Sequence, residues 1–163
     1  MDLIRKHGLK LPALFVCVVF LQSLFYKFSR SVETIYIFEE KLDPWAASLG
    51  FPGLFAPGGL FSAYVVGSTE LVASALILVG TLAAWPLIQA LGAVLGLGVI
   101  SGAIVFHLFT PLGIAVRNAD GSFDGGQLFA MACLVWLSCL LIIVVRRREL
   151  LGLLGTRRPM MPA

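Results

Sequence analysis

The sequence predicts an all-α membrane protein, a transmembrane four-helix bundle with a short amphipathic helix on its outer face between spans one and two. Its 163 residues are 59% hydrophobic and only 13% charged, whereas soluble proteins carry roughly a quarter charged residues. The mean hydropathy is +0.96, and a globule of this size lacks the interior volume to bury so much apolar sequence in water. Four apolar runs approach the roughly 20 residues that a membrane-spanning helix needs.

These four runs are the predicted spans, within one membrane domain over residues 1–163. They cover about residues 11–28, 60–84, 86–109 and 126–145. The first run is interpreted as a retained span, because no small-residue cleavage site of a signal peptide follows it. Trp85 and Pro86 alone separate the second and third runs. This short break predicts an antiparallel helical hairpin.

The connections on the outer side are predicted to carry structure of their own. In the first, Asp43 is expected to cap a short helix with Pro44 at its first position, and Gly50 is expected to close it. Upstream, apolar residues at helical spacing over residues 32–42 predict an amphipathic extension of helix one along the outer surface. We interpret this connection as a lid packed on the bundle. The second connection, residues 118–126, is dense in turn formers and predicts a tight turn or short hairpin.

The basic residues predict the orientation of the chain in the membrane. They precede span one at Arg5, Lys6 and Lys10 and follow span four at Arg146, Arg147 and Arg148. In both outer connections acidic residues outnumber basic ones. By the positive-inside rule both termini face the cytoplasm, and an even number of spans agrees with this. The high pI therefore reflects topology, and the sequence shows no basic face that would predict a nucleic-acid partner.

Small residues in span three predict close helix packing. Gly92 and Gly96 form one Gly-x-x-x-Gly pair, and Gly98 and Gly102 form a second pair on another side of the helix. Glycines let helix backbones approach closely in a bilayer, where burial of apolar surface drives little association. Two faces of span three are therefore expected to admit neighbours.

Glu70 is the most informative polar residue. A carboxylate about ten residues into a membrane helix costs several kcal/mol unless it is paired, hydrated or neutral, so Glu70 is predicted to face the bundle interior. The topology places Lys27 and His107 toward the same leaflet, and we predict a buried polar cluster of Lys27, Glu70 and His107. Gln22 and Gln127 are further candidates. Two simpler roles stay open: Lys27 extends its amine to the lipid headgroups, and His107 hydrogen-bonds a carbonyl at a helix end.

Other chemistry is not indicated. Cys133 and Cys139 are six residues apart, on different faces of span four, and no Cys-x-x-Cys motif occurs; a thiol pair between Cys17 and span four stays open. The spans contain no residues at metal-ligand spacing, so no metal site is predicted. Neither a nucleophile elbow nor a nucleotide-binding loop is present. Catalytic residues therefore stay unassigned.

Three segments together carry a family resemblance. They are SLFYKF at the end of span one (23–28), LGFP in the outer connection (49–52) and GSTELVASALILVG in span two (67–80). In this combination the chain resembles the DoxX family of four-helix membrane proteins over roughly residues 11–145. Lys27 and Glu70 match the polar positions of the family pattern, whereas the other site candidates rest on topology alone. Ser23 stands where the family commonly has glycine.

The resemblance implies the fold more strongly than an activity. DoxX-type proteins include membrane subunits similar to those of thiosulfate:quinone oxidoreductase, proteins associated with redox-stress enzymes, and distant assembly factors. We therefore expect an accessory subunit of the bacterial inner membrane, serving a quinone-linked or sulfur/redox-stress oxidoreductase system and at most a subunit of such an enzyme. A quinone is the candidate cofactor, and a soluble or membrane oxidoreductase or a second copy of the chain is the candidate protein partner. The alternative is a non-catalytic membrane-protein assembly factor or scaffold.

Overall fold

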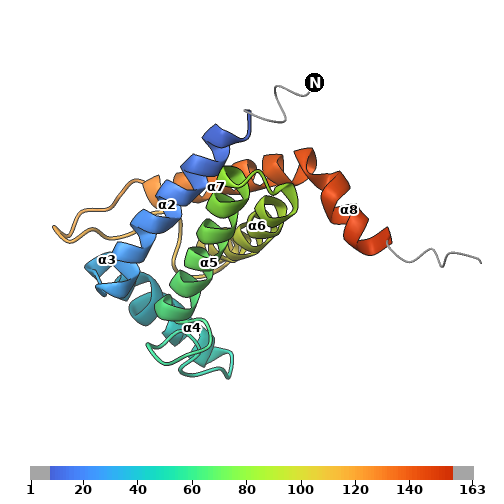
Figure 1. Cartoon of the computed structure of the whole chain (residues 1–163). Helices are drawn as coiled ribbons and strands as arrows, with labels where there is room; N and C mark the ends of the chain where they lie inside the picture. The colour runs from blue at the N-terminus through green and yellow to red at the C-terminus, as the bar shows by residue number, and fades with distance from the viewer. Residues whose placement is uncertain (1–7, 156–163) are drawn as a thin grey trace, which may run out of the picture.

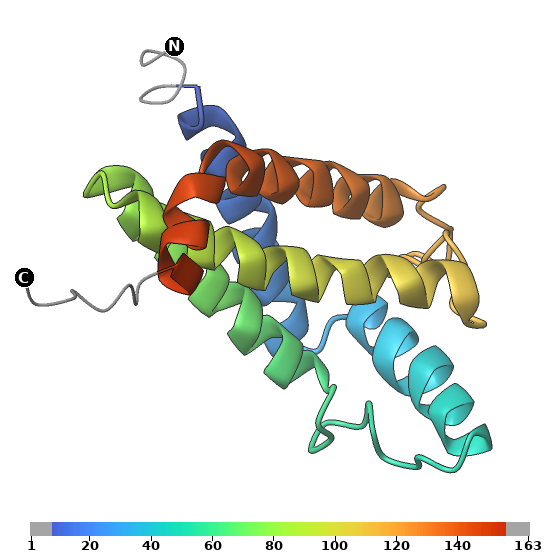
Figure 2. The ribbon, with the colours of Figure 1, turned by 90° about the vertical axis from the view of Figure 1, so that its right-hand side faces the viewer.

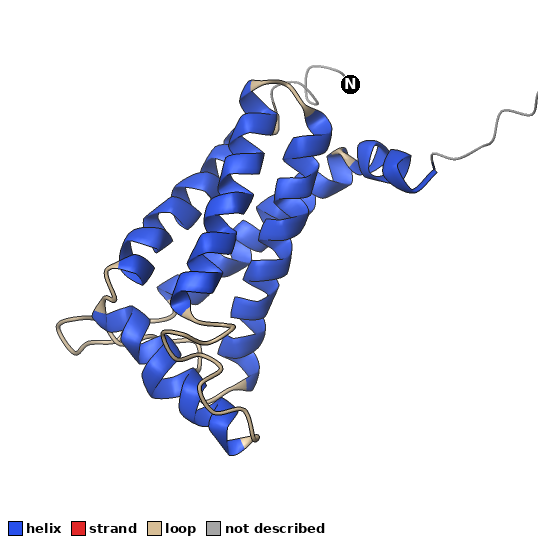
Figure 3. Ribbon diagram, turned by 60° about the horizontal axis from the view of Figure 1, so that its bottom comes forward, coloured by secondary structure: helices blue, strands red, loops and turns tan. Residues whose placement is uncertain are grey.

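Four long apolar helices make up the body of the molecule. The computed structural model describes residues 8–155. Four of its helices are long and apolar enough to cross a membrane: α2 (Lys10–Phe28), α5 (Ala63–Leu82), α6 (Pro86–Phe109) and α7 (Gln127–Val145). They lie alongside one another as a bundle (Figures 1 and 3), and no strand occurs among residues 8–155. The predicted all-α fold of a multi-pass membrane protein is thus confirmed.

The spans begin and end close to the predicted residues. α6 runs over the range that the sequence predicts, whereas α5 begins three residues later than predicted because Ser62 caps it and accepts a hydrogen bond from the Val65 N–H. α5 ends at Leu82, and Ala84 then takes a φ of +54°, which no continuing right-handed helix allows. Pro86 starts α6. The predicted α5–α6 hairpin is therefore present.

Close packing at glycines holds the bundle together. A Cβ atom placed on Gly92 would lie 2.7 Å from the Ile77 backbone nitrogen, and one placed on Gly96 would lie 3.1 Å from the Phe20 ring. The core around these contacts is fully apolar and includes Val16, Phe20, Ala73, Ile77, Val135 and Ile142. Leucine and valine side chains cover much of the outer surface of the spans. Such a surface suits hydrocarbon, in which helices satisfy their backbone hydrogen bonds internally.

A tilted helical segment covers one end of the bundle. It consists of α3 (Val32–Ile35), the π-helix η1 (Tyr36–Leu42) and α4 (Asp43–Ser48), and we call this segment the cap. Tyr36, Phe38 and Leu42 of the cap form a second apolar core with residues of two loops. These are Phe55, in the loop before α5, and Leu112 and Val116, in the loop between α6 and α7. The predicted amphipathic lid is therefore present as a packed element of the fold.

Two details of the cap correct the prediction. The cap is no extension of helix one, because Arg30 takes a φ of +51° and Ser31 then caps α3. Asp43 does not cap a new helix either, since η1 runs directly into α4. The π-type bonding of η1 lets the helix pass Pro44, which has no N–H to donate. The Asp43 carboxylate instead accepts hydrogen bonds from the backbone of the next loop, at Phe55 N (3.0 Å) and Ala56 N (3.2 Å).

The turns around these elements behave as the sequence predicts. Gly50 takes a φ of +93° and closes α4; its N–H binds the Ala47 carbonyl, and the Phe51 N–H binds that of Ala46. This pair of hydrogen bonds is a Schellman motif. In the second connection the Asn118 N–H donates to the Ser122 carbonyl at 2.8 Å. Both predicted turns are confirmed.

One helix was not predicted. α8 (Arg147–Gly155) starts almost directly after α7 and turns away from its axis. Figure 2 shows α8 and the cap at opposite ends of the bundle. We call these the α8 end and the cap end. The arginines at its start predicted only the topology of the chain, and the helix itself was not predicted.

Candidate functional site

An ion pair joins α2 to α5 near the cap end. Lys27 Nζ lies 2.7 Å from Glu70 Oε2 and 2.8 Å from Glu70 Oε1. Ser23 Oγ donates to Glu70 Oε2 at 3.1 Å and also contacts the Lys27 amine. The two charged side chains are 14% and 5% exposed. The prediction that Glu70 faces the interior and pairs with Lys27 is therefore confirmed.

The local sequence explains why these groups meet. Ser23 and Lys27 are four residues apart in α2, and Gly67 and Glu70 are three apart in α5, so each pair shares one helix face. Gly67 lets the helices approach, because a Cβ atom there would lie 3.1 Å from the Phe28 ring. Both Glu70 oxygens are engaged by α2, so the cluster satisfies its own hydrogen bonds. Such a cluster fixes the register of α5 against α2.

His107 and Gln127 do not belong to this cluster, which corrects the prediction. His107 Nδ1 lies 2.6 Å from the Gly113 carbonyl oxygen, and its ring contacts Phe129 edge-on. Gln127 is exposed at the start of α7. Within residues 8–155, no hydrogen bond or ion pair links either residue to Glu70. His107 thus fills the simpler role, bonding a carbonyl just beyond the end of its helix.

Near His107, Asp124 organises the second connection. Its Oδ1 accepts hydrogen bonds from Val116 N (2.8 Å) and Gly126 N (2.9 Å), and its Oδ2 accepts one from Leu128 N (2.9 Å). Partial burial raises the pKa of this carboxyl, but the three N–H donors and the charge of His107 together lower it below the usual 3.8. The ionised carboxylate therefore holds the loop against the start of α7. The sequence predicted only a turn at this position.

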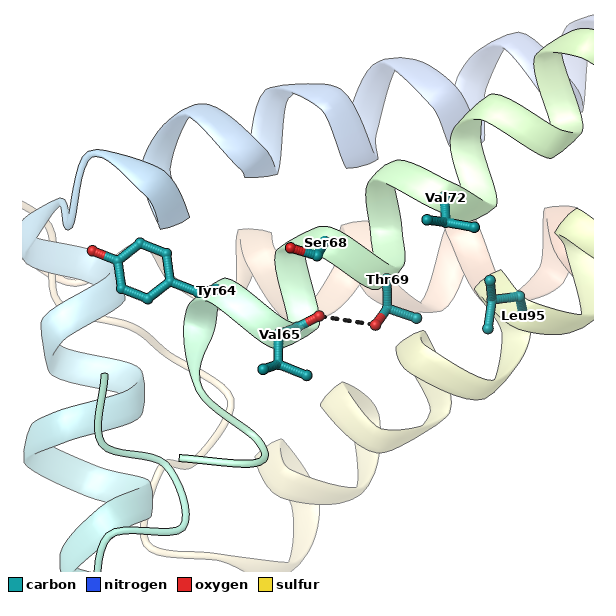
Figure 4. Close-up of a pocket in the computed structure, with 6 residues that line it drawn as sticks. All are labelled: Tyr64, Val65, Ser68, Thr69, Val72 and Leu95. Carbon is teal, nitrogen blue, oxygen red and sulfur yellow. Dashed lines mark hydrogen bonds between the residues drawn. The ribbon is translucent and has the colours of Figure 1, made fainter. Parts of the chain in front are cut away.

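A groove open to the surroundings runs along α5 and α6 in the half of the bundle nearer the cap. Its volume is about 410 Å³, and its lining consists of Tyr64, Val65, Ser68, Thr69 and Val72 of α5 and Leu95 of α6 (Figure 4). The Thr69 hydroxyl donates to the Val65 carbonyl at 2.8 Å. The exposed Ser68 hydroxyl has no hydrogen-bond partner among the described residues. This groove was not predicted, although hydroxyls at Tyr64 and Ser68, four residues apart in an apolar span, indicate a partly polar face.

A second polar group lies toward the α8 end. Gln89 is 1% exposed; its Nε2 donates to Thr81 Oγ1 at 2.9 Å, and its Oε1 accepts a hydrogen bond from Arg146 Nε at 2.9 Å. Gly80 makes room, since a Cβ atom there would lie 2.3 Å from the Gln89 nitrogen. These contacts tie α5, α6 and the end of α7 together.

The remaining candidate chemistry gives no site. Among residues 8–155, no group of three or more His, Cys, Asp and Glu side chains could hold a metal ion. Cys17 and Cys139 are buried in the same apolar core, and all three cysteines are free. Comparisons with models of protein families, with curated proteins and with solved structures found no match.

Proposed function

We propose that this protein is an accessory subunit of a quinone-linked oxidoreductase in the bacterial inner membrane, in the manner of DoxX-type subunits. The observation that carries the proposal is the groove between α5 and α6, with its unpartnered Ser68 hydroxyl. A hydroxyl that faces hydrocarbon without a partner is costly. A membrane-soluble ligand that accepts a hydrogen bond removes this cost.

The depth of Ser68 suits a quinone ring. Ser68 lies five residues after the first residue of α5, which places it about 7.5 Å along the helix at 1.5 Å per residue. This position lies in the second turn of the span, at its cap end. Ser68 supplies a donor to a ring carbonyl, while Val72 and Leu95 supply apolar contacts for a prenyl tail. The groove is open, and five of its six lining residues lie on one helix, α5, so a ligand there would keep one side in the lipid.

Each part of the chain has a separate task in this proposal. A bound quinone supplies the two-electron redox chemistry. Ser68 orients its ring by one hydrogen bond, and the lining of the groove keeps the tail beside α5. Lys27 and Glu70 act as positioning residues, because their ion pair sets the rotation of α5 and hence the direction of the groove. Electron transfer to a substrate then belongs to the partner oxidoreductase.

Native mass spectrometry of protein extracted gently from its own membrane tests this proposal. We expect a retained quinone and a stoichiometric oxidoreductase chain. Ser68→Ala should lower quinone affinity about fivefold, the equivalent of one hydrogen bond of about 1 kcal/mol. Ser138→Ala is the matched control, since Ser138 is a half-buried serine on α7 whose hydroxyl donates to the Leu134 carbonyl. A protein that never carries quinone, or equal losses in both variants, contradicts the proposal.

A scaffold or assembly factor is the second candidate. The observation that favours it is the completeness of the Ser23, Lys27 and Glu70 cluster, which needs no ligand to satisfy it. In that case Ser68→Ala changes nothing, Glu70→Gln lowers only the yield of folded protein, and the co-purifying chains are varied unfinished membrane proteins. The same mass spectrometry experiment therefore separates the two functions.

A further inference from the structure

α8 has a fixed position relative to the membrane. α7 ends at Val145 and α8 begins at Arg147, so only Arg146 separates a spanning helix from it. The Arg146 Nε–H donates to the Gln89 side chain at 2.9 Å, which ties this corner to the start of α6. With no linker to carry it away, α8 must start at the edge of the bilayer.

The residues of α8 are segregated as in helices that lie in a membrane surface. In its sequence, RRELLGLLG, Arg148 lies on one side of the helix and Leu150 and Leu153 lie on the other, at about 100° per residue. Leu153, on the apolar side, is 54% exposed. The spans are apolar all round, whereas α8 is amphipathic, the pattern of an interfacial helix. Exposed leucines beside the end of a span are stabilised when they contact the adjacent acyl chains instead of water.

The arginines of α8 differ from those at the cap end in their pairing. At the cap end Arg30 binds Glu39 and Arg117 binds Glu40, each at 2.8–2.9 Å. Arg147 and Arg148 are exposed, and within residues 8–155 neither forms an ion pair. Two adjacent guanidinium groups at the bilayer edge thus lack an anion from the described part of the chain.

We propose that α8 is a binding site for anionic phospholipid, in which Arg147 and Arg148 bind the headgroup phosphates and Leu153 inserts among the acyl chains. Guanidinium groups bind phosphate in a bidentate manner, and anionic leaflets attract basic residues beside a span. The membrane is favoured over a soluble protein as occupant because the leucines lie where α7 leaves the bilayer. This inference is independent of the quinone.

Lipid titration of the full-length protein in detergent, followed by native mass spectrometry, tests the site. Two arginines at about 1 kcal/mol each predict an affinity for phosphatidylglycerol about 30-fold above that for phosphatidylcholine. In the R147Q/R148Q variant the ratio should fall to near one, whereas in the control variant R30Q, at the cap end, it should stay at the wild-type value.

Hydrogen exchange of the wild-type protein in nanodiscs gives a test that needs no variant. The amides of α8 should exchange more slowly in discs that contain phosphatidylglycerol than in discs of phosphatidylcholine alone. Equal lipid affinities, equal exchange in both discs, or protection of α8 only when a soluble protein is added would each overturn the proposal.

Discussion

Lys27 and Glu70 bind each other at a site that offers little water to either charge. Removal of one partner leaves the other charge buried and unpaired, which costs far more than removal of both. Their value lies in specificity as much as in stability, because the two side chains meet at only one rotation of α5 against α2. The Ser23 hydroxyl strengthens that restriction by donating to Glu70.

Replacement of one partner should therefore be worse than replacement of both. Glu70→Leu alone is expected to lower the free energy of unfolding by about 3 kcal/mol, whereas Lys27→Met combined with Glu70→Leu should recover at least half of that loss. Unfolding in mixed detergent micelles, followed by circular dichroism, measures both. Arg30→Gln is the control, since the Arg30–Glu39 pair is exposed and should contribute about 0–1 kcal/mol. A double variant as unstable as the single one would contradict this account.

Asp124 makes a contribution to stability that depends on pH. Its folded pKa lies below the unfolded value of 3.8, so its contribution is complete above that value and is lost as pH falls through the folded pKa. Asp124→Asn should therefore destabilise the protein at neutral pH, and its difference from wild type should shrink at acid pH. Thermal unfolding at several pH values measures this. The control Glu33→Gln, a cap carboxylate with no hydrogen bond among the described residues, should show no such convergence.

The sequence shows which polar residues would be costly to leave unpaired in a span, but it does not show which groups pair with them. Glu70 is predictable as an interior residue because an unpaired carboxylate in a span is prohibitive, and topology then offers Lys27 as partner. The prediction for His107 was wrong. Topology places His107 in the same leaflet as Glu70, but its ring bonds to the loop carbonyl of Gly113, only six residues away. Asp43 is likewise satisfied by a loop 12 residues later. Such partners depend on loop paths, which residue spacing does not encode.

The packing between helices depends on the positions of their glycines. In α5, Gly80 faces the backbone of α6, and an added Cβ would lie 2.3 Å from the Gln89 nitrogen. In α6, Gly98 has nothing within 4 Å of such a Cβ atom. Of the two predicted packing faces of α6, the face with Gly92 and Gly96 contacts other helices of the bundle, whereas Gly98 faces outward.

The same substitution should have opposite effects at these two glycines. Gly80→Ala is expected to destabilise the α5–α6 hairpin by at least about 1 kcal/mol, because backbone cannot move aside as a flexible side chain does. Gly98→Ala should stabilise α6 by about 0.5–1 kcal/mol through helix propensity. Thermal unfolding of each variant in detergent compares them. A large loss of stability with Gly98→Ala, together with a smaller particle on size exclusion, would instead reveal a helix partner from a second copy.

Element boundaries were predictable where the chain itself carries the signal. The 20-residue apolar lengths, the Trp85–Pro86 break and Gly50 each act through local backbone chemistry. The π-helix η1 and α8 were not predictable in this way. η1 differs from the α-helices beside it only in its hydrogen-bond pattern, and α8 begins one residue after α7 ends, so neither boundary is marked by a break in the sequence pattern.

Across the whole molecule, polar contacts lie toward both ends of an apolar bundle. The Lys27–Glu70 cluster lies near the cap end, and the Gln89, Thr81 and Arg146 contacts lie toward the α8 end. Between them the core is mostly apolar, with one further contact in which the Trp136 indole N–H donates to Ser101 Oγ at 3.0 Å. Apolar packing alone leaves helices in lipid free to slide and rotate, because it distinguishes poorly between registers. Directional contacts near both ends remove that freedom.

Charge at the two ends also sets the direction of the protein in the membrane. The α8 end carries the exposed Arg147 and Arg148, whereas Arg30 and Arg117 at the cap end are bound to glutamates. The positive-inside rule predicts that the α8 end faces the cytoplasm. In intact cells a membrane-impermeant maleimide should therefore label Ser122→Cys in the second connection, and should label Arg147→Cys only after the membrane is opened. The native cysteines are buried or half-buried and provide the background. Labelling of Arg147→Cys in intact cells would mean that the cap faces the cytoplasm and that α8 meets the opposite leaflet.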